Sequence, residues 1–136
     1  MPHERHLVGH SDADVLLHAV TDALLGAAGL ADIGQIFPNT DEANRNRDSA
    51  EMLALAHGQV RAAGYRLVNL DCVVAAERPK LATHKQRIIA RIAEILAVEL
   101  NQINMKAKTG EGMGPVGREE IIEARCVALI EVIETS

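Results

Sequence analysis

Residues 65–77, YRLVNLDCVVAAE, alternate between apolar and polar side chains over most of their length. In an extended chain one side carries the four apolar residues Val68, Leu70, Cys72 and Val74. The other side carries Asn69 and Asp71, and this period of two predicts a half-buried strand. The apolar face of such a strand needs a covering layer, so the rest of the chain has to supply a sheet and the helices that pack on it.

Helical periodicity before and after this strand predicts the covering layer. Ser11 is a candidate N-cap, with Asp14 three residues later as in a capping box, and the helix that follows can end at Gly29. Its apolar stripe consists of Leu16, Leu17, Val20, Ala23, Leu24 and Ala27. A second helix begins at Asp48 or Ser49 and ends at Gly64. A third, over residues 83–100, has the apolar stripe Ile88, Ile92, Ile95 and Leu96.

The remaining segments complete an α+β (α/β layered) domain over residues 1–136. Residues 30–50 are rich in Asp, Asn, Gly and Pro and predict a long surface loop, whereas residues 103–109 predict a short strand. Residues 121–133 fit a strand or a helix. A strand is favoured because β-branched residues are dense there and Glu123, Arg125 and Glu131 lie opposite the apolar face. Three strands make a narrow sheet, so either a strand is missing or another subunit covers the edge of the sheet.

Composition restricts the core and the classes of partner. Hydrophobic residues make up 48% of the chain and aromatic residues only 1%, so Ala, Leu, Ile and Val must build the core. The net charge of −5 argues against nucleic acid and anionic membranes as partners. Cys72 and Cys126 lie in apolar runs and are expected to be buried thiols of a reducing compartment. Residues 1–12 have no signal-peptide pattern and no segment is long enough to span a bilayer, so a cytoplasmic protein is expected.

Asp14, His18 and Asp22 are spaced four residues apart, which puts them on one helix face. Capping and the helix dipole explain Asp14, and Asp22 is expected to be merely exposed. His18 lies between apolar residues, where a buried core histidine is more usual than a metal ligand. A catalytic zinc site would need three protein ligands.

Two further segments could hold phosphate. Residues 108–118, KTGEGMGPVGR, combine four glycines with Lys108 and Arg118. Backbone N–H groups there could cradle phosphate, but composition alone favours a flexible hairpin turn. Pro79 and Lys80 mark a strand-to-helix crossing, where the helix N-terminus could bind an anion.

Three motifs together carry a resemblance to a known family. Residues 10–41 (HSDADVLLHAVTDALLGAAGLADIGQIFPNTD), 77–81 (ERPKL) and 104–118 (NMKAKTGEGMGPVGR) resemble the 2-C-methyl-D-erythritol 2,4-cyclodiphosphate synthase family. The resemblance implies a homotrimer whose sheets face a central core, with active sites between subunits. It also implies a metal-assisted ring closure of a CDP-methylerythritol phosphate substrate, with release of CMP.

The resemblance implies a role for each matching residue. His10 and Thr109 would be catalytic. His18 would bind zinc, and Glu111 would bind magnesium or manganese. The substrate-binding residues would be His10, Ser11, Asp32, Ile33, Gly34, Phe37, Pro38, Asn39, Thr40, Asp41, Ala76, Pro79, Lys80, Leu81, Ala82, Lys108, Thr109, Gly110, Glu111, Pro115 and Arg118.

The chain also departs from the family pattern. The Asp-x-His motif that would complete the zinc site does not occur in the 136 residues. We interpret the chain as N-terminally shortened, because the other pocket residues are largely kept, and expect weak or no activity from it in this form. The alternatives are a non-catalytic trimeric module that binds a cytidine nucleotide or an isoprenoid phosphate, and a misfolded fragment. Asn39, Lys108 and Pro115 also differ from the residues usual in the family.

Overall fold

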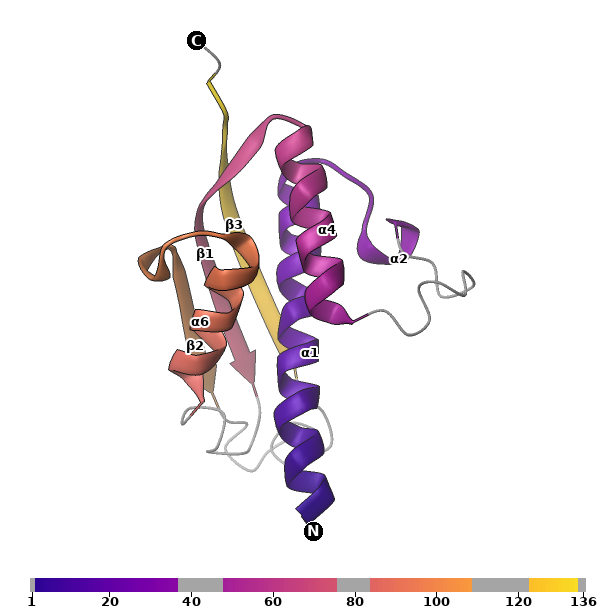
Figure 1. The fold of residues 1–136 in the computed structure, drawn as a ribbon, viewed down its shortest axis with the longest axis vertical. Coiled ribbons are helices and arrows are strands. Elements are labelled where there is room, and N and C mark those ends of the chain that lie inside the picture. The colour runs from indigo at the N-terminus through magenta and orange to yellow at the C-terminus, as the bar shows by residue number, and fades with distance from the viewer. Residues whose placement is uncertain (1, 37–47, 76–83, 109–122, 135–136) are drawn as a thin grey trace.

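The computed structural model describes residues 2–36, 48–75, 84–108 and 123–134, with side chains from residue 14 onward. Its elements are α1 (Pro2–Ala27), α2 (Ile33–Ile36), α4 (Ser49–Ala62), β1 (Tyr65–Ala75), α6 (Lys85–Leu96), the 3-10 helix η1 (Leu100–Gln102), β2 (Ile103–Lys108) and β3 (Glu123–Val132). Figure 1 shows α1, α4 and α6 on one side of the sheet. The predicted α+β architecture, with one sheet face covered by helices, is therefore confirmed.

β1 is the central strand of the three-stranded sheet, whose order is β2-β1-β3. β2 runs parallel to β1 and β3 runs antiparallel to it. Along β1 the side chains alternate between the helix layer and the opposite face, which we call the open face. Leu70, Cys72 and Val74 are fully buried under the helices. Residues 121–133, which fitted two kinds of structure, contain the strand β3, as predicted.

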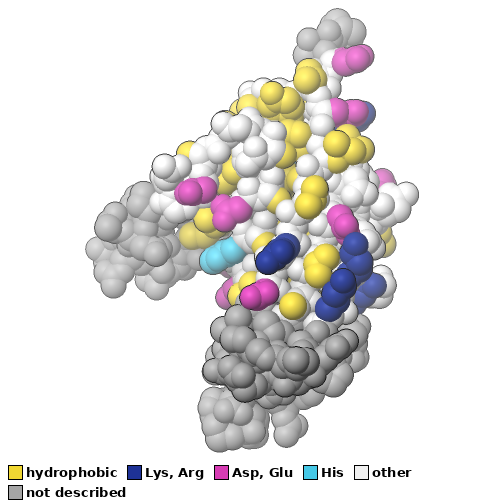
Figure 2. Space-filling model, turned by 180° about the vertical axis from the view of Figure 1, so that it is seen from behind, with side chains coloured by type: hydrophobic (Ala, Val, Ile, Leu, Met, Phe, Trp, Pro, Cys, Tyr) yellow, Lys and Arg dark blue, Asp and Glu magenta, His cyan; other side chains and the backbone are white. Residues whose placement is uncertain are grey.

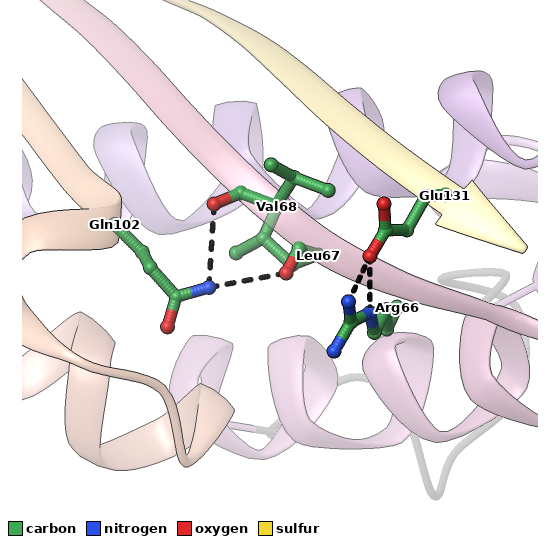
Figure 3. A network of polar contacts seen from close by, with 5 residues as sticks. All are labelled: Arg66, Leu67, Val68, Gln102 and Glu131. Carbon is green, nitrogen blue, oxygen red and sulfur yellow. Dashed lines mark hydrogen bonds and ion pairs between the residues drawn. The ribbon is translucent and has the colours of Figure 1, made fainter. Parts of the chain in front are cut away.

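A register shift between Leu67 and Asn69 corrects one detail of the predicted strand. Leu67 is buried at this irregularity and Val68 is only half-buried, so Val68 does not share the buried row of Leu70. The side-chain amide of Gln102 donates hydrogen bonds to the carbonyl oxygens of Leu67 (3.1 Å) and Val68 (3.3 Å) (Figure 3). These bonds hold η1 against the irregular part of β1. An ion pair between Arg66 and Glu131 links β1 to β3 in the same view.

The core is aliphatic, as the composition predicts. Helix α1 buries five apolar side chains in it: Leu16, Leu17, Val20, Leu24 and Leu25. Two residues of the predicted stripe lie outside this set, because Ala23 is half-buried and Ala27 is exposed. On α6 the buried residues are Ile89, Ile92, Ala93 and Leu96, while Ile88 and Ile95 lie at the edge of the core. The buried stripe of α6 is therefore rotated slightly about the helix axis from the predicted one.

Helix α1 begins earlier than the capping pattern predicts. Its backbone is helical from Pro2, so Ser11 lies inside the helix and the prediction of Ser11 as N-cap is wrong. Proline is favoured in the first turn of a helix because its missing N–H would have no partner there. The predicted start of α4 and end of α1 are confirmed, because Asp48 caps α4 through a bond from the Ala50 N–H (2.9 Å) and Gly29 follows α1 with a φ of 72°. The helix predicted over residues 83–100 is shorter, because α6 ends at Leu96 and Ala97 adopts a left-handed conformation with a φ of 55°.

Residues 30–50 are not an uninterrupted loop. They contain the short helix α2 and, from Ser49, the start of α4. Asp32 caps α2, because its carboxylate accepts a hydrogen bond from the Gln35 N–H at 2.9 Å while the Gln35 side chain accepts one from the Asp32 N–H at 3.3 Å. This reciprocal pair resembles a capping box and fixes the turn that leads out of α1.

Candidate active site

One edge of the sheet gathers the ends of all three strands. Ala75 at the end of β1 is the register partner of Lys108 on β2 and of Glu123 on β3. Figure 1 shows this edge beside the N-terminal half of α1. Ligands of open α/β sheets bind outside the carboxyl ends of parallel strands, and β1 and β2 both end here. This edge is therefore the candidate active site.

The two predicted substrate segments are attached to this edge. Ala76 follows Ala75 directly, and Thr109 follows Lys108 directly. The register therefore brings the start of the ERPKL segment and the start of the Gly-rich segment to neighbouring strand ends. The predicted residues Ala76, Pro79, Lys80, Leu81, Ala82, Thr109, Gly110, Glu111, Pro115 and Arg118 themselves lie outside the described residues. Lys108 is described, and its side chain is exposed beside the edge.

Helix α1 carries the histidines singled out in the sequence. The backbone of His10 and Ser11 is helical, but their side chains lie outside the described part of the chain. Asp14, His18 and Asp22 are all exposed on the helix surface. The interpretation of His18 as a core histidine is therefore wrong, and its imidazole is accessible to a ligand.

The side chains described from residue 14 onward do not by themselves build a zinc centre. Among them no group of three His, Cys, Asp or Glu residues could hold a metal ion. His18 offers one imidazole, whereas catalytic zinc takes three protein ligands and keeps one open position. Glu111, the residue expected to bind magnesium or manganese, lies outside the described residues.

The two aspartates beside His18 have structural partners. The Ser49 hydroxyl donates a 2.6 Å hydrogen bond to the Asp14 carboxylate, which links α1 to the first turn of α4. The Ile33 N–H donates to the Asp22 carboxylate at 3.0 Å, which links α1 to α2. Sequence reasoning missed both links. Their partners are 35 and 11 residues away, so no local spacing could have indicated them.

The predicted substrate residues that the structure describes do not meet within one chain. Asp32, Ile33 and Gly34 lie at the start of α2, which Figure 1 shows beside α4 and away from α6 and β2. The sheet edge with Lys108 lies on a different flank of the molecule. Phe37, Pro38, Asn39, Thr40 and Asp41 follow α2 and lie outside the described residues.

Among the histidines whose side chains are described, the one buried in the core is His57 on α4. It is 9% exposed, and its Nε2 atom has no hydrogen-bond partner among the described residues. Burial, and after it the positive charge of Arg61, lowers the pKa of His57 below 6.5. The imidazole is therefore uncharged at neutral pH, and the side chain contributes to the packing of the helix layer.

The open face of the sheet combines charges with exposed apolar side chains (Figure 2). Asp71 on β1 accepts hydrogen bonds from Lys106 (3.1 Å) and Asn104 (3.0 Å) on β2. Both bonds lower the pKa of the Asp71 carboxyl, and the bond from Lys106 has the larger effect. On β3, Val127 is 72% exposed and Leu129 is 60% exposed on the same face. Such apolar exposure on a sheet is typical of a contact surface.

The chain matches known proteins over most of its length. The model of the YgbB family matches residues 1–131. A 2-C-methyl-D-erythritol 2,4-cyclodiphosphate synthase from Verminephrobacter eiseniae is 59% identical over 124 residues, which cover 91% of this chain and 68% of that protein. No helix among the described residues is long and apolar enough to cross a membrane.

Solved structures are similar to this chain in fold as well as in sequence. The bifunctional IspDF from Campylobacter jejuni matches with a TM-score of 0.84 and 41% identity, over 88% of this chain and 32% of that one. The chain thus corresponds to about a third of the bifunctional protein. IspF from Plasmodium falciparum in complex with CDP matches with a TM-score of 0.78 and 32% identity, over 88% of this chain and 72% of that one.

Proposed function

The chain belongs to the YgbB family, and from this premise we propose that it is a 2-C-methyl-D-erythritol 2,4-cyclodiphosphate synthase. It converts 4-diphosphocytidyl-2-C-methyl-D-erythritol 2-phosphate into the 2,4-cyclodiphosphate and CMP. The observation that carries the proposal is the register at the sheet edge, where Lys108, Ala75 and Glu123 are partners on adjacent strands. Because of this register, the two proposed substrate segments begin at neighbouring strand ends. The fold is one that the synthases share.

The reaction is an internal displacement at phosphorus. An oxygen of the 2-phosphate forms a bond to the β-phosphorus, and the bond from that phosphorus to the oxygen of the α-phosphate breaks, so that CMP leaves. Nucleophile and electrophile belong to one molecule, so the protein mainly has to hold the two phosphates in line and neutralise their charge. Lys108 and Arg118 are the cations that we assign to this task, while Lys80 would belong to the cytidine pocket.

We assign the other site residues by their position along the chain. Ala76, Pro79, Leu81 and Ala82 would form the cytidine pocket after β1. The complex of the Plasmodium IspF with CDP supports a cytidine nucleotide as ligand. His10, Ser11 and Thr109 would contact the reacting phosphates. Residues 32–34, with 37–41, would cover the methylerythritol part.

A homotrimer with sites between subunits would reunite these residues. Within one chain, α2 and the sheet edge lie on different flanks, so one subunit could supply residues 32–34 to the strand ends of its neighbour. The open face, with Val127 and Leu129 exposed, is the surface that we propose for the central contact. We further propose that residues 1–136 form one domain and that the protein acts in the cytoplasm.

Two divalent ions belong to the proposal, although the described residues do not complete the zinc site. We propose His18 as one zinc ligand, because its imidazole is exposed on α1, and Glu111 as the ligand of magnesium or manganese. Bound divalent cations would neutralise the phosphate charge.

The decisive experiment measures CMP release from the substrate with zinc and magnesium present. The 136-residue chain and a form extended upstream by an Asp-x-His strand are compared, and the extended form is expected to turn over faster. In the active form, Thr109→Val should lower kcat by about 100-fold because the proposed contact of the Thr109 hydroxyl with a reacting phosphate is lost. Arg87→Gln, a change on the exposed surface of α6, should leave kcat unchanged.

The same materials test the non-catalytic alternative. The relatives are named as synthases, and we therefore favour the enzyme. Calorimetry with CMP, with and without zinc, separates the two functions. CMP binding without zinc uptake and without turnover in either form would replace the enzyme with a nucleotide-binding module.

A further inference from the structure

The two cysteines face each other across the sheet. Cys72 on β1 and Cys126 on β3 are register partners, and their Sγ atoms lie 3.0 Å apart. Both are free thiols. Cys72 is fully buried, and Cys126 is half-buried at the edge of the core. They are separated by 54 residues in the sequence, so only the pairing of β1 with β3 brings them together.

This placement meets the requirements of a disulfide. Residues directly opposite each other in antiparallel strands have Cα atoms about 4.5–5.5 Å apart, which lies within the range that disulfides span. The two sulfurs need to approach by only about 1 Å to reach a bond length of about 2.05 Å. Rotation about the Cα–Cβ bonds can supply most of that movement, so the strand pairing is retained.

We propose that Cys72 and Cys126 form a redox modification site, which a peroxide converts into a cross-strand disulfide. One sulfur, that of the more accessible Cys126, attacks the peroxide oxygen and becomes a sulfenic acid, with release of water when the oxidant is hydrogen peroxide. The Cys72 sulfur then attacks the sulfenic sulfur and displaces a second water. Overall the two thiols lose two protons and two electrons, and the peroxide accepts them and is reduced to two waters.

The surroundings of the pair set its sensitivity. The hydrogen bond that Cys126 donates to Cys72, and after it burial, raises the pKa of the Cys126 thiol. The thiolate is the reactive form, so oxidation is slow without an excess of peroxide. Once the sulfenic acid has formed, the neighbouring sulfur is already in contact. Closure of the disulfide should therefore outrun further oxidation of Cys126.

The experiment treats the whole protein with hydrogen peroxide and then removes the oxidant. The expected product is lower in mass by two hydrogen atoms, has no titratable thiol after unfolding, and yields a reducible peptide that joins residues 72 and 126. The Tm should rise by roughly 10 °C, because the cross-link closes a long loop, and should return on reduction. Cys126→Ala is the matched control, in which neither the cross-link nor the Tm shift can form.

Two results would overturn the proposal. In the first, both thiols remain titratable after prolonged treatment. In the second, Cys126 gains oxygen atoms as a sulfinic or sulfonic acid while Cys72 stays reduced. Neither the mass nor the thiol count depends on substrate turnover, so the test is independent of the proposed enzyme activity.

Discussion

The covered face and the open face of the sheet use the same three strands for opposite purposes. On the covered face the row Ile103, Leu70 and Ala128 packs under the helices, and Leu70 is fully buried. On the open face the row Asn104, Asp71 and Val127 combines an amide, a carboxylate and an exposed apolar side chain. The covered face therefore stabilises the fold of one chain, while the open face is available to other chains.

The largest effect is expected on the covered face. Leu70→Ala should lower the free energy of unfolding by about 2–5 kcal/mol, because it leaves a cavity in a closely packed core. Urea unfolding measures the loss. Leu100→Ala is the matched control, because the Leu100 side chain on η1 is 59% exposed and should contribute little. Similar losses in the two variants would mean that the covered face is not the main core.

A second substitution tests whether the open face is a contact surface. For the proposed homotrimer, Leu129→Asp should leave the helix content unchanged and yield monomers, because three carboxylates would be brought together at a central contact. Light scattering coupled to gel filtration gives the mass. Leu55→Asp is the control, since Leu55 on α4 is also an exposed leucine, at 44%, but lies in the helix layer. If Leu129→Asp keeps the mass of the wild-type assembly, the open face does not hold the subunits together.

The smallest expected effect depends on pH and concerns the helix layer alone. The pKa of His57 is lowered below 6.5 in the folded chain, so the unfolded chain binds more protons below that pH. The stability that the neutral imidazole contributes is present above pH 6.5 and is lost as the pH falls through the lower, folded value. His57→Leu should remove this part of the acid sensitivity.

Unfolding free energies at about pH 8 and about pH 5.5 measure that slope. Gln59→Leu serves as the control, because Gln59 lies on the exposed surface of the same helix as His57 and does not titrate. Its slope should match that of the wild type. Equal slopes in all three proteins would show that protonation of His57 does not limit stability in acid.

Local patterns predicted the three strands and the three longer helices, because each depends on neighbours in the sequence, but they did not predict the short helices α2 and η1. The period-two alternation identified β1, and the β-branched residues opposite Glu123, Arg125 and Glu131 identified β3. The irregularity at Val68 could not be predicted, because it is a shift in the register between β1 and β3, which are far apart in the sequence. The early start of α1 was missed because the Ser11 and Asp14 pair resembles a capping box, whereas Asp14 bonds to Ser49.

The candidate site could also be predicted only in part from the sequence. The family motifs indicated its residues, but the sequence could not show that Ala75 lies between Lys108 and Glu123, because register is a long-range property. The apolar neighbours of His18 in the sequence favoured a core position for it, whereas among the described histidines His57 is the one in the core. Apolar neighbours along a helix do not determine which side of it faces the core. The Cys72–Cys126 contact likewise follows only from strand pairing.

The position of β1 in the middle of the sheet also affects how the chain is made. A ribosome releases β1 before β2 and β3, and β1 pairs with β3 across sequence separations of up to 67 residues, between Tyr65 and Val132. Until β3 has left the ribosome, the edge of β1 that pairs with β3 has no hydrogen-bonding partner there. Long-range pairing of this kind slows folding, and an open strand edge invites aggregation. The nascent chain is therefore most vulnerable between the release of β1 and the arrival of β3.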